Sequence, residues 1–304
     1  MIEPPQAHPA WDSFWRYDRL SSFLTTPGAP NYAPPIADGW RAFFKSLTDG
    51  ARVLDLATGN GAIAVMAVEA GKDFSVTGAD LAAVEPTAFV TRNHAELKQI
   101  RFLPDTPAEA LPLADASIDA IVSQYGVEYS NLARSIPEAV RVLAPGGRLR
   151  FATHATEGAV ARDTANAIAD ADFLIGLDIV GLAERSDTAL DAFNIGLDAF
   201  NIGLKAIADR ALTATDRAML ANVHQTLCDA YDHRRGELAL TAENLHAEIT
   251  AHRDRQAALL SATLSTNQMA ELGTMLAAQG LTAIAHGEQR DGADLIGHVI
   301  EATR

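Results

Sequence analysis

The sequence predicts an α/β protein that combines a mainly parallel, doubly wound sheet with a helical insertion late in the chain. From Arg52 onward, short apolar runs alternate with helical stretches. This alternation requires crossover connections and places helices on both faces of a parallel sheet. Residues 155–265 interrupt the rhythm with a proline-free, Ala- and Leu-rich stretch of helical periodicity, and the alternation returns after Asn267. We therefore expect the helical stretch to be inserted into one α/β domain.

The first 50 residues predict an N-terminal helical and aromatic segment. They contain all three tryptophans, Trp11, Trp15 and Trp40, and six further aromatic residues around a proline cluster. Two short helices on either side of a loop fit this composition. The aromatic side chains either fill the protein core or fold as a cap over a ligand pocket, and the sequence leaves both interpretations open.

Seven short apolar runs are the strand candidates. The first is followed by a glycine-rich turn, and the fifth is entered through Pro145-Gly146-Gly147. Short apolar runs bounded by turn residues are typical of buried strands. We expect strands at residues 53–56, 74–78, 100–103, 118–123, 148–153, 281–285 and 295–302.

The helical insertion contains a direct repeat, in which residues 191–197 and 198–204 have the same sequence. A seven-residue period places apolar side chains on one helical stripe. We expect this stripe to form the core of a helical subdomain, and the alternative is a self-association surface that would make the protein a homodimer. The stripe consists of Leu190, Phe193, Leu197, Phe200 and Leu204.

The composition excludes several classes of partner. The chain has 304 residues, 48% of them hydrophobic, and a formal net charge of −15, which together indicate a globular core and an acidic surface. It has four lysines, and no basic run is longer than Arg234-Arg235. Binding to a phosphate backbone needs a basic surface, so we expect no nucleic-acid substrate.

The sequence also predicts a cytoplasmic protein without a membrane segment or a metal. Cys228 is the single cysteine, which forbids an internal disulfide and is compatible with a reducing compartment. The N-terminus lacks a secretory signal pattern, and no apolar segment approaches the ~20 residues that span a bilayer. The histidines of the insertion have no spacing typical of a metal site: His224, His233, His246 and His252.

A glycine-rich turn after the first predicted strand is the main candidate for a ligand site. Gly59 and Gly61 permit a tight turn, and the helix that follows presents free N–H groups. The pattern alone also suits a dinucleotide. Asp55 beside the turn favours a different ligand, because its carboxylate would repel a pyrophosphate but could meet an ammonium group or brace the turn. Asp80, at the end of the next strand, suits the two hydroxyls of a ribose.

Together with three further segments, this turn resembles the class I S-adenosylmethionine-dependent methyltransferases. The segments follow one another at the spacing of that family and cover roughly residues 50–154: Leu54-Asp-Leu-Ala-Thr-Gly59-Asn-Gly61, Gly78-Ala-Asp80-Leu81, Ala108 to Ser123, and Val142 to Leu149. The resemblance implies a Rossmann-like doubly wound sheet of seven strands with the last strand antiparallel. It also implies S-adenosyl-L-methionine as cofactor. The methyltransferase domain would comprise residues 51–154 and 266–304, with residues 1–50 as the cap segment and residues 155–265 as the insertion after the fifth strand.

The resemblance assigns a set of cofactor-binding residues. The turn would hold the methionine part of the cofactor, Asp80 the ribose, and Leu81 and Ala108 the adenine. Asp105 replaces an acidic adenine contact that many members carry nearer to Ala108, and Ala57 replaces a glycine of the family's turn. Gln124 and Tyr125 would flank the transferable methyl group, and Tyr17 of the cap segment completes the set. The turn residues are Asp55, Ala57, Thr58, Gly59, Asn60 and Gly61.

Three residues near the expected ends of the fourth and fifth strands are catalytic candidates. His154 is the expected general base, because an imidazole can remove a proton from an attacking hydroxyl or amine. The alternative is a histidine that only supports its neighbours. Tyr125 and Glu128 lie on the same expected edge of the sheet, where ligands bind in open α/β folds. Because a sulfonium is already an activated electrophile, positioning and exclusion of water could supply most of the catalysis.

We therefore expect S-adenosylmethionine-dependent methyl transfer to a small-molecule acceptor, with the cap segment and the insertion over the acceptor site. The fourth strand ends Ser123-Gln124-Tyr125-Gly126 and lacks the Asn/Asp-Pro-Pro-aromatic motif of many amino-directed methyltransferases of nucleic acids and proteins. A nicotinamide-dependent oxidoreductase of the short-chain type would need a Tyr-x-x-x-Lys pair, which the chain lacks. The remaining alternative is a protein that binds the cofactor without methyl transfer and uses the insertion to bind a partner.

Overall fold

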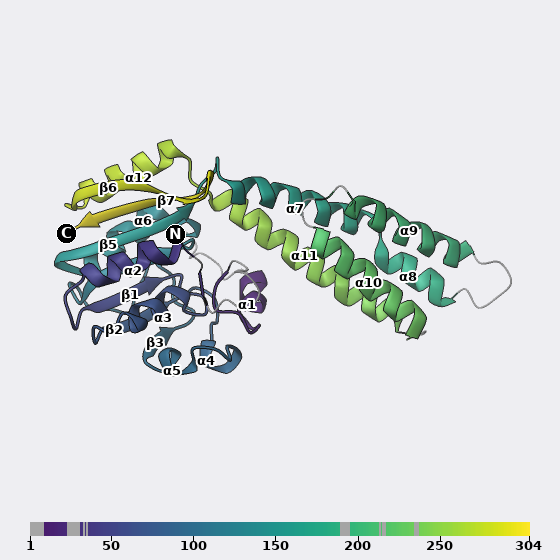
Figure 1. Ribbon diagram of the computed structural model, residues 1–304, viewed down its shortest axis with the longest axis horizontal. Coiled ribbons are helices and arrows are strands. Elements are labelled where there is room, and N and C mark those ends of the chain that lie inside the picture. Colours follow the sequence, from purple (N-terminus) through teal and green to yellow (C-terminus); the bar gives the residue numbers. More distant parts are fainter. Residues whose placement is uncertain are drawn as a thin grey trace. The chain divides into compact units, whose positions relative to one another are not determined.

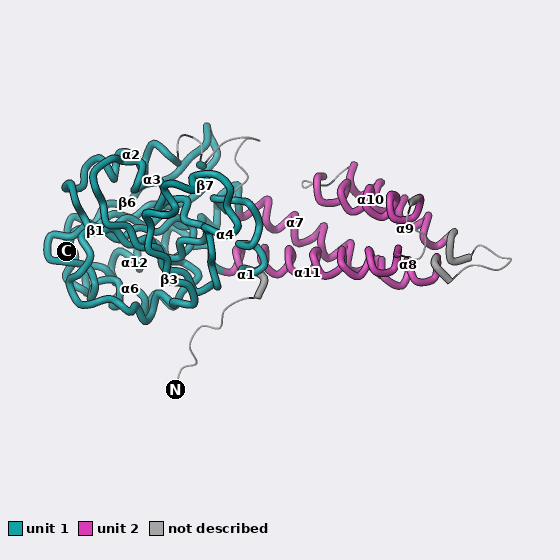
Figure 2. Tube along the Cα trace, turned by 90° about the horizontal axis from the view of Figure 1, so that it is seen from below, with its two compact units in different colours: residues 1–160, 262–304 teal, residues 161–261 magenta. Residues whose placement is uncertain are grey.

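The computed structural model describes residues 9–22, 31–32, 34, 36–188, 195–212, 214, 217–233 and 237–304. The chain divides into two compact units, coloured separately in Figure 2. Unit 1 comprises Met1–Val160 and Ala262–Arg304, and unit 2 comprises Ala161–Ser261. Among the described residues, no helix has the length and apolar character needed to cross a bilayer.

One mixed seven-stranded sheet forms the centre of unit 1 (Figure 1). Its strand order is β3-β2-β1-β4-β5-β7-β6; β1 to β5 pair in parallel, and β7 is antiparallel to both β5 and β6. This confirms the predicted Rossmann-like sheet. The strands are β1 Arg52–Leu56, β2 Ser75–Ala79, β3 Ile100–Leu103, β4 Ile118–Gln124, β5 Leu143–His154, β6 Thr282–Asp291 and β7 Asp294–Thr303.

Helices cover both faces of this sheet because the buried residues of the strands alternate between two apolar cores. Val53 packs with Trp40 and Phe44 in one core, whereas the next residue, Leu54, packs with Ile136 and Leu272 in the other. The first core is formed with α2 and α3, and the second with α6 and α12. The helices of unit 1 are α1 Pro9–Trp15, α2 Ile36–Ser46, α3 Ala62–Glu69, α4 Pro86–Phe89, α5 His94–Leu97, the 3₁₀ helix η1 Val127–Tyr129, α6 Leu132–Val142 and α12 Thr266–Ala278.

Two strands are longer than the sequence predicts. β5 begins at Leu143, so the Pro145-Gly146-Gly147 turn that was expected before the strand lies within it. Leu143 pairs with Ile118 of β4, and the next pair along β4 is Ala120 with Arg148, so the register between the two strands shifts at this turn. β6 continues to Asp291, six residues beyond the expected end at Ala285. Its second half is polar, and pairing with β7 keeps it extended.

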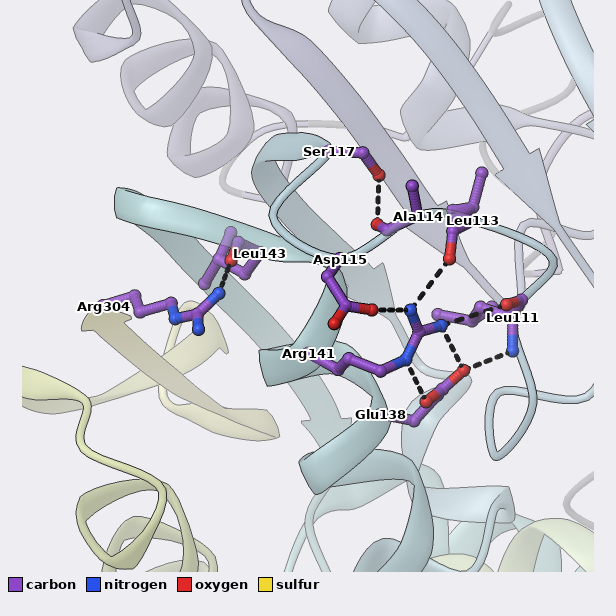
Figure 3. A network of polar contacts seen from close by, with 9 residues as sticks. All are labelled: Leu111, Leu113, Ala114, Asp115, Ser117, Glu138, Arg141, Leu143 and Arg304. Atoms are coloured by element: carbon purple, nitrogen blue, oxygen red, sulfur yellow. Dashed lines mark hydrogen bonds and ion pairs between the residues drawn. The ribbon is translucent and has the colours of Figure 1, made fainter.

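The loop that leads into β4 is held by a partly buried polar cluster around Arg141 and Glu138 of α6 (Figure 3). The Arg141 guanidinium donates to Glu138 at 2.8 Å, to Asp115 at 2.5 Å, and to the carbonyls of Leu113 and Leu111 at 2.9 and 3.2 Å. Glu138 in turn accepts the Leu111 amide at 2.7 Å. These contacts raise the pKa of Arg141 above its ordinary value and hold the start of β4 in register.

Unit 2 is helical and has an apolar core of its own. The side chains of Leu174, Phe200, Leu220 and Leu227 are among those buried in it. Phe200 and Leu204 of the predicted stripe contribute to this core, whereas Leu190, Phe193 and the side chain of Leu197 lie outside the described residues. The helices are α7 Ala159–Gly176, α8 Ile179–Thr188, α9 Ile195–Ala211, α10 Arg217–His233 and α11 Leu238–Ala262.

Candidate active site

A left-handed turn connects β1 to α3 at the carboxyl end of the sheet. Ala57, Gly59 and Gly61 have φ values of 52°, 52° and 87°, a region in which only glycine is free of Cβ strain. The Thr58 amide donates to the carbonyl of Ala79 at 3.1 Å, and the Gly61 amide donates to Thr58 at 2.8 Å. Ala57, which stands where the family has a glycine, thus adopts the same left-handed backbone region as Gly59 and Gly61 despite its Cβ atom.

Asp55 braces this turn from inside the protein. Its carboxylate is 2% exposed and accepts the Thr58 hydroxyl at 2.7 Å and the Ala64 amide at 3.2 Å. Burial raises the pKa of Asp55 to about 7, and the two hydrogen bonds oppose that rise. Of the two roles that the sequence left open for Asp55, the structure shows the bracing contact.

Asp80 connects the end of β2 to the same turn. One carboxylate oxygen accepts the Gly59 amide at 2.7 Å and the other accepts the Ala82 amide at 2.8 Å. Burial raises the pKa of Asp80 to about 6, although both backbone hydrogen bonds lower it. Each carboxylate oxygen retains a second lone pair, so Asp80 can still accept hydroxyl groups of a ligand.

The predicted adenine contacts lie beside Asp80, at the edge between β2 and β3. The Thr106 amide donates to the Asp80 carbonyl at 2.7 Å, which brings the segment after β3 to this edge. Leu81 and Ala108 are half-buried there. Asp105 is exposed and has a φ of 51°.

Helix α1 lies against the glycine turn. A Cβ atom added to Gly59 would lie 2.4 Å from the indole of Trp15. The Asn60 side chain donates to the Trp15 carbonyl at 3.0 Å, and Asp12 accepts the Ala83 amide at 3.0 Å. The cap segment therefore contacts both loops that the resemblance assigns to the cofactor.

The sequence singled out a different aromatic residue of this segment. Tyr17 is 56% exposed, and its ring lies 5.4 Å from the Arg19 guanidinium. Trp15 is the residue that contacts the turn. The spacing of Trp11 and Trp15 by four residues places them on one face of α1, with ring centroids 6.3 Å apart. This was the one sequence signal that could have identified Trp15.

His154 and Glu128 form a buried pair at the carboxyl ends of β5 and β4. One Glu128 carboxylate oxygen accepts both the His154 backbone amide at 2.9 Å and its ring Nδ1–H at 2.8 Å. The side chains are 3% and 0% exposed. Because a carboxylate accepts and does not donate, it holds the proton on Nδ1 and leaves Nε2 of the neutral ring as the basic nitrogen.

Aromatic rings surround this pair. The Tyr125 ring stacks on His154 with centroids 4.4 Å apart, and Tyr129 lies edge-on to His154 at 6.3 Å and to Trp11 at 5.7 Å. Burial raises the pKa of Tyr125 and Tyr129 well above the ordinary value and that of Tyr32 to about 12. These phenols keep their protons near neutral pH, so His154 is the group in this cluster suited to accept one.

Gln124, predicted to flank the methyl group, takes part in a buried side-chain network. The Trp40 indole N–H donates to its Oε1 at 2.5 Å, and its amide exchanges hydrogen bonds of 3.1 and 3.2 Å with Gln289 of β6. The sequence named Trp40 only as one of the aromatic residues of the N-terminal segment, and it gave no signal for Gln289, which belongs to no motif.

The reversal of strand order between β1 and β4, the glycine turn and the acidic residue after β2 define an α/β domain that binds a nucleotide-like cofactor. Residues 53–147 match the family model described as a methyltransferase domain. The chain thus carries a methyltransferase domain of the class I S-adenosylmethionine-dependent family, and S-adenosylmethionine is the cofactor of that family.

Individual relatives match only this part of the chain. A demethylmenaquinone methyltransferase of Thermus thermophilus is 41% identical over 101 residues, which cover 32% of this chain and 44% of that protein. A malonyl-[acyl-carrier protein] O-methyltransferase of Methylococcus capsulatus is 39% identical over 104 residues, or 34% and 37% of the two chains. A solved SAM-dependent methyltransferase of Aquifex aeolicus aligns over 40% of this chain and 65% of that one, with 24% identity and a TM-score of 0.34. The chain spans about half or less of the length of these two curated relatives.

The residues at the turn fit S-adenosylmethionine. Among the described residues, no Lys, Arg or His forms an ion pair with Asp55 or Asp80. Asn60 Oδ1 is buried and accepts no hydrogen bond within this part of the chain. A ligand with an ammonium group and ribose hydroxyls supplies the positive charge and the donors that these buried oxygens lack.

Replacing Asp80 tests this assignment. We expect Asp80→Ala to weaken the binding of S-adenosylhomocysteine at least about tenfold, because hydrogen bonds to a charged group contribute ~1.5–3 kcal/mol each. Calorimetry with purified protein measures this. The exposed Asp38→Ala is the matched control and should leave the affinity unchanged; an unchanged affinity in Asp80→Ala would refute the ribose contact.

The raised pKa of Asp55 predicts a pH-dependent stability. Between its unfolded value near 3.8 and its folded value of about 7, the native protein binds more protons than the unfolded chain. This contribution to the free energy of unfolding is therefore present at low pH and is lost as the pH rises to about 7. From pH 5 to pH 7.5, the wild type should lose on the order of 2 kcal/mol more than Asp55→Asn.

Urea unfolding followed by tryptophan fluorescence measures this difference, since all three tryptophans belong to unit 1. Asp119→Asn is a suitable control because the Arg52 guanidinium lowers the pKa of Asp119, which titrates below this range. Equal pH slopes for wild type and Asp55→Asn would contradict the prediction.

Proposed function

We propose that this protein transfers a methyl group from S-adenosylmethionine to a small-molecule acceptor, and that His154 and Glu128 act as the general base. The observation that carries the proposal is the buried His154–Glu128 hydrogen bond at the same edge of the sheet as the glycine turn. A histidine oriented by a carboxylate is a recurrent arrangement for proton removal. It suits an acceptor that must lose a proton from oxygen, nitrogen or carbon.

In this mechanism the cofactor, when bound, supplies an activated methyl group on a sulfonium. The glycine turn, with Asp55 and Asp80, holds and orients it. His154 Nε2 takes the proton that the acceptor atom loses, and Glu128 stabilises the resulting imidazolium through Nδ1–H. The rings of Tyr125 and Tyr129 exclude water from this step, so that catalysis combines positioning with proton removal.

The acceptor we propose is small and largely apolar. The aromatic rings of Trp11, Tyr125 and Tyr129 surround the base, and the net charge of −15 disfavours a nucleic acid. The two relatives named above differ in acceptor, one being a demethylmenaquinone and the other a malonyl-[acyl-carrier protein] methyltransferase. Demethylmenaquinone is tested as a candidate of the proposed class. Malonyl-[acyl-carrier protein] is tested as an acceptor outside it, because it carries a charged carboxylate on a protein, and turnover with it would contradict the small, apolar acceptor.

Replacing the base tests the chemistry. We expect His154→Gln to lower turnover at least about 100-fold, since general-base catalysis contributes ~10²–10⁴-fold. S-adenosylhomocysteine formation is measured with demethylmenaquinone, with malonyl-[acyl-carrier protein] and with a pool of small metabolites, and binding of S-adenosylhomocysteine is measured in parallel. Binding should persist in His154→Gln, and the exposed His94→Gln serves as the matched control.

The outcomes separate the alternatives. Undiminished turnover in His154→Gln would refute the role of His154 as base. A wild type that binds S-adenosylhomocysteine but turns over with no acceptor would favour the alternative function, in which the protein binds the cofactor and uses residues 155–265 to engage a partner. A wild type without cofactor binding would refute the whole proposal.

For unit 2 we propose the role of a cap over the acceptor, with self-association through its helices as the alternative. Both ends of the insertion meet in unit 1: Ala155 pairs with Leu264, and the Thr156 hydroxyl donates to the Thr263 hydroxyl at 3.1 Å. A short linker can therefore replace residues 161–261.

Deleting unit 2 in this way should spare cofactor binding and abolish turnover, because the acceptor loses its cover and water enters. Calorimetry with S-adenosylhomocysteine and the turnover assay measure the two effects, and sedimentation of the full chain tests for a dimer. Turnover that survives the deletion would refute the cap.

A further inference from the structure

Gln289 is the one buried residue of β6. Every other residue of this strand is exposed or half-exposed, as expected at the edge of a sheet, whereas Gln289 is 6% exposed. Its polarity excludes a simple packing role, because burying an amide costs free energy unless the amide is hydrogen-bonded. The partners of Gln289 therefore show what it does.

Gln289 accepts a hydrogen bond from the Tyr125 hydroxyl, and the direction of this bond is determined by the network. The Trp40 indole can only donate, so Gln124 presents its Oε1 to Trp40 and its Nε2 to Gln289 Oε1. Gln289 Nε2 in turn donates to Gln124. Gln289 Oε1 is thereby aimed at Tyr125 as an acceptor.

The register of the last three strands places the Tyr125 ring over a row of residues that includes the base. His154 of β5 pairs with Gly297 of β7, which pairs with Gln289 of β6. The ring stacks on His154 at one end of this row and donates its hydroxyl to Gln289 at the other. A Cβ atom at Gly297 would lie 2.5 Å from the Thr153 carbonyl oxygen and 2.8 Å from Tyr125 Cε1, so the glycine lets both the β5 backbone and the ring approach β7 closely.

Tyr125 needs such support because its backbone is strained. Its φ of 57° lies in the left-handed region, which disfavours a bulky side chain. Its amide donates to the Ala152 carbonyl at 2.7 Å, which anchors the backbone to β5. Gly297 and Gln289 then fix the ring itself.

We infer that Gln289 and Gly297 are positioning residues for the His154–Glu128 pair and act through the ring of Tyr125. With the ring fixed over His154, the imidazole keeps the orientation that directs Nδ1–H to Glu128 and Nε2 to the acceptor. This inference rests on the proposed function for its catalytic meaning, whereas the orientation of His154 can be measured without turnover. The C-terminal hairpin of β6 and β7 thus forms part of the active site.

Histidine ring NMR on the full-length protein tests this inference. In the wild type, His154 should be the Nδ1–H tautomer with a protected Nδ1 proton, and its carbon-bound ring protons should be shifted upfield by the stacked Tyr125. His154→Gln assigns these signals. In Gln289→Leu and in Gly297→Ala, we expect loss of the upfield shift and of the protected proton. Gln99→Leu, at an exposed position away from the network, is the matched control and should give the wild-type spectrum.

A double substitution tests the route through Tyr125. Tyr125→Phe keeps the ring but removes the donor, so adding Gln289→Leu to Tyr125→Phe should cause no further change in the His154 signals. Wild-type His154 signals in Gln289→Leu would overturn the inference, and so would fully additive effects of the two substitutions. If Gly297→Ala fails to fold, Gln289→Leu and the double substitution still decide the matter.

Calorimetry with S-adenosylhomocysteine keeps this test separate from that of the function. We expect the affinity of Gln289→Leu for S-adenosylhomocysteine to stay within about twofold of the wild type. Its partners Gln124 and Tyr125 are predicted to flank the methyl group, which this product lacks, and the hydrogen bonds of Asp55 and Asp80 to the turn do not involve Gln289. A larger loss would make Gln289 part of the cofactor site and overturn the inference. A wild type that does not bind this ligand would refute the proposed function, while the His154 spectra would still decide the role of Gln289.

Discussion

The architecture of the site depends on one strained turn at the carboxyl ends of β1 and β2. Three residues between Ala57 and Gly61 adopt left-handed conformations, and the turn keeps this shape because two buried carboxylates hold it. Asp55 accepts from the Thr58 hydroxyl and the α3 amide of Ala64, and Asp80 accepts the amide of Gly59. Burial raises the pKa of both acids, which means that keeping the two carboxylates charged inside the protein costs free energy. A cationic ligand beside them would offset that cost.

The remainder of the site is built around this turn by aromatic contacts. Trp15 of α1 lies on Gly59, and Trp11 of the same helix meets Tyr129 beside His154. One short helix therefore contacts both the cofactor turn and the surroundings of the candidate base. This arrangement suits the mechanism proposed above, in which positioning and exclusion of water act together with proton removal.

The fold was largely predictable because its signals are local. Seven short apolar runs predicted the seven strands, and the loss of that rhythm predicted the helical segment after β5. The errors occurred where tertiary pairing extends a strand beyond its apolar run. β6 continues through the polar residues from His286 to Asp291 because β7 supplies hydrogen-bonding partners along its whole length. Hydrophobic periodicity cannot detect such a segment, and Gln289 lies in it.

The candidate site likewise has a part that the sequence predicts and a part that only the tertiary structure shows. The glycine turn, Asp55 and Asp80 could be predicted from the sequence, because they follow one another within one β-α-β segment whose backbone geometry brings them together. Other contacts join parts of the chain that no single motif contains. Glu128 and His154 lie 26 residues apart, Trp15 of α1 meets Gly59 of the turn, and the row formed by His154, Gly297 and Gln289 crosses three strands. Strand order and register decide those contacts, and neither is written in any short stretch of sequence, because each depends on the simultaneous packing of the whole sheet.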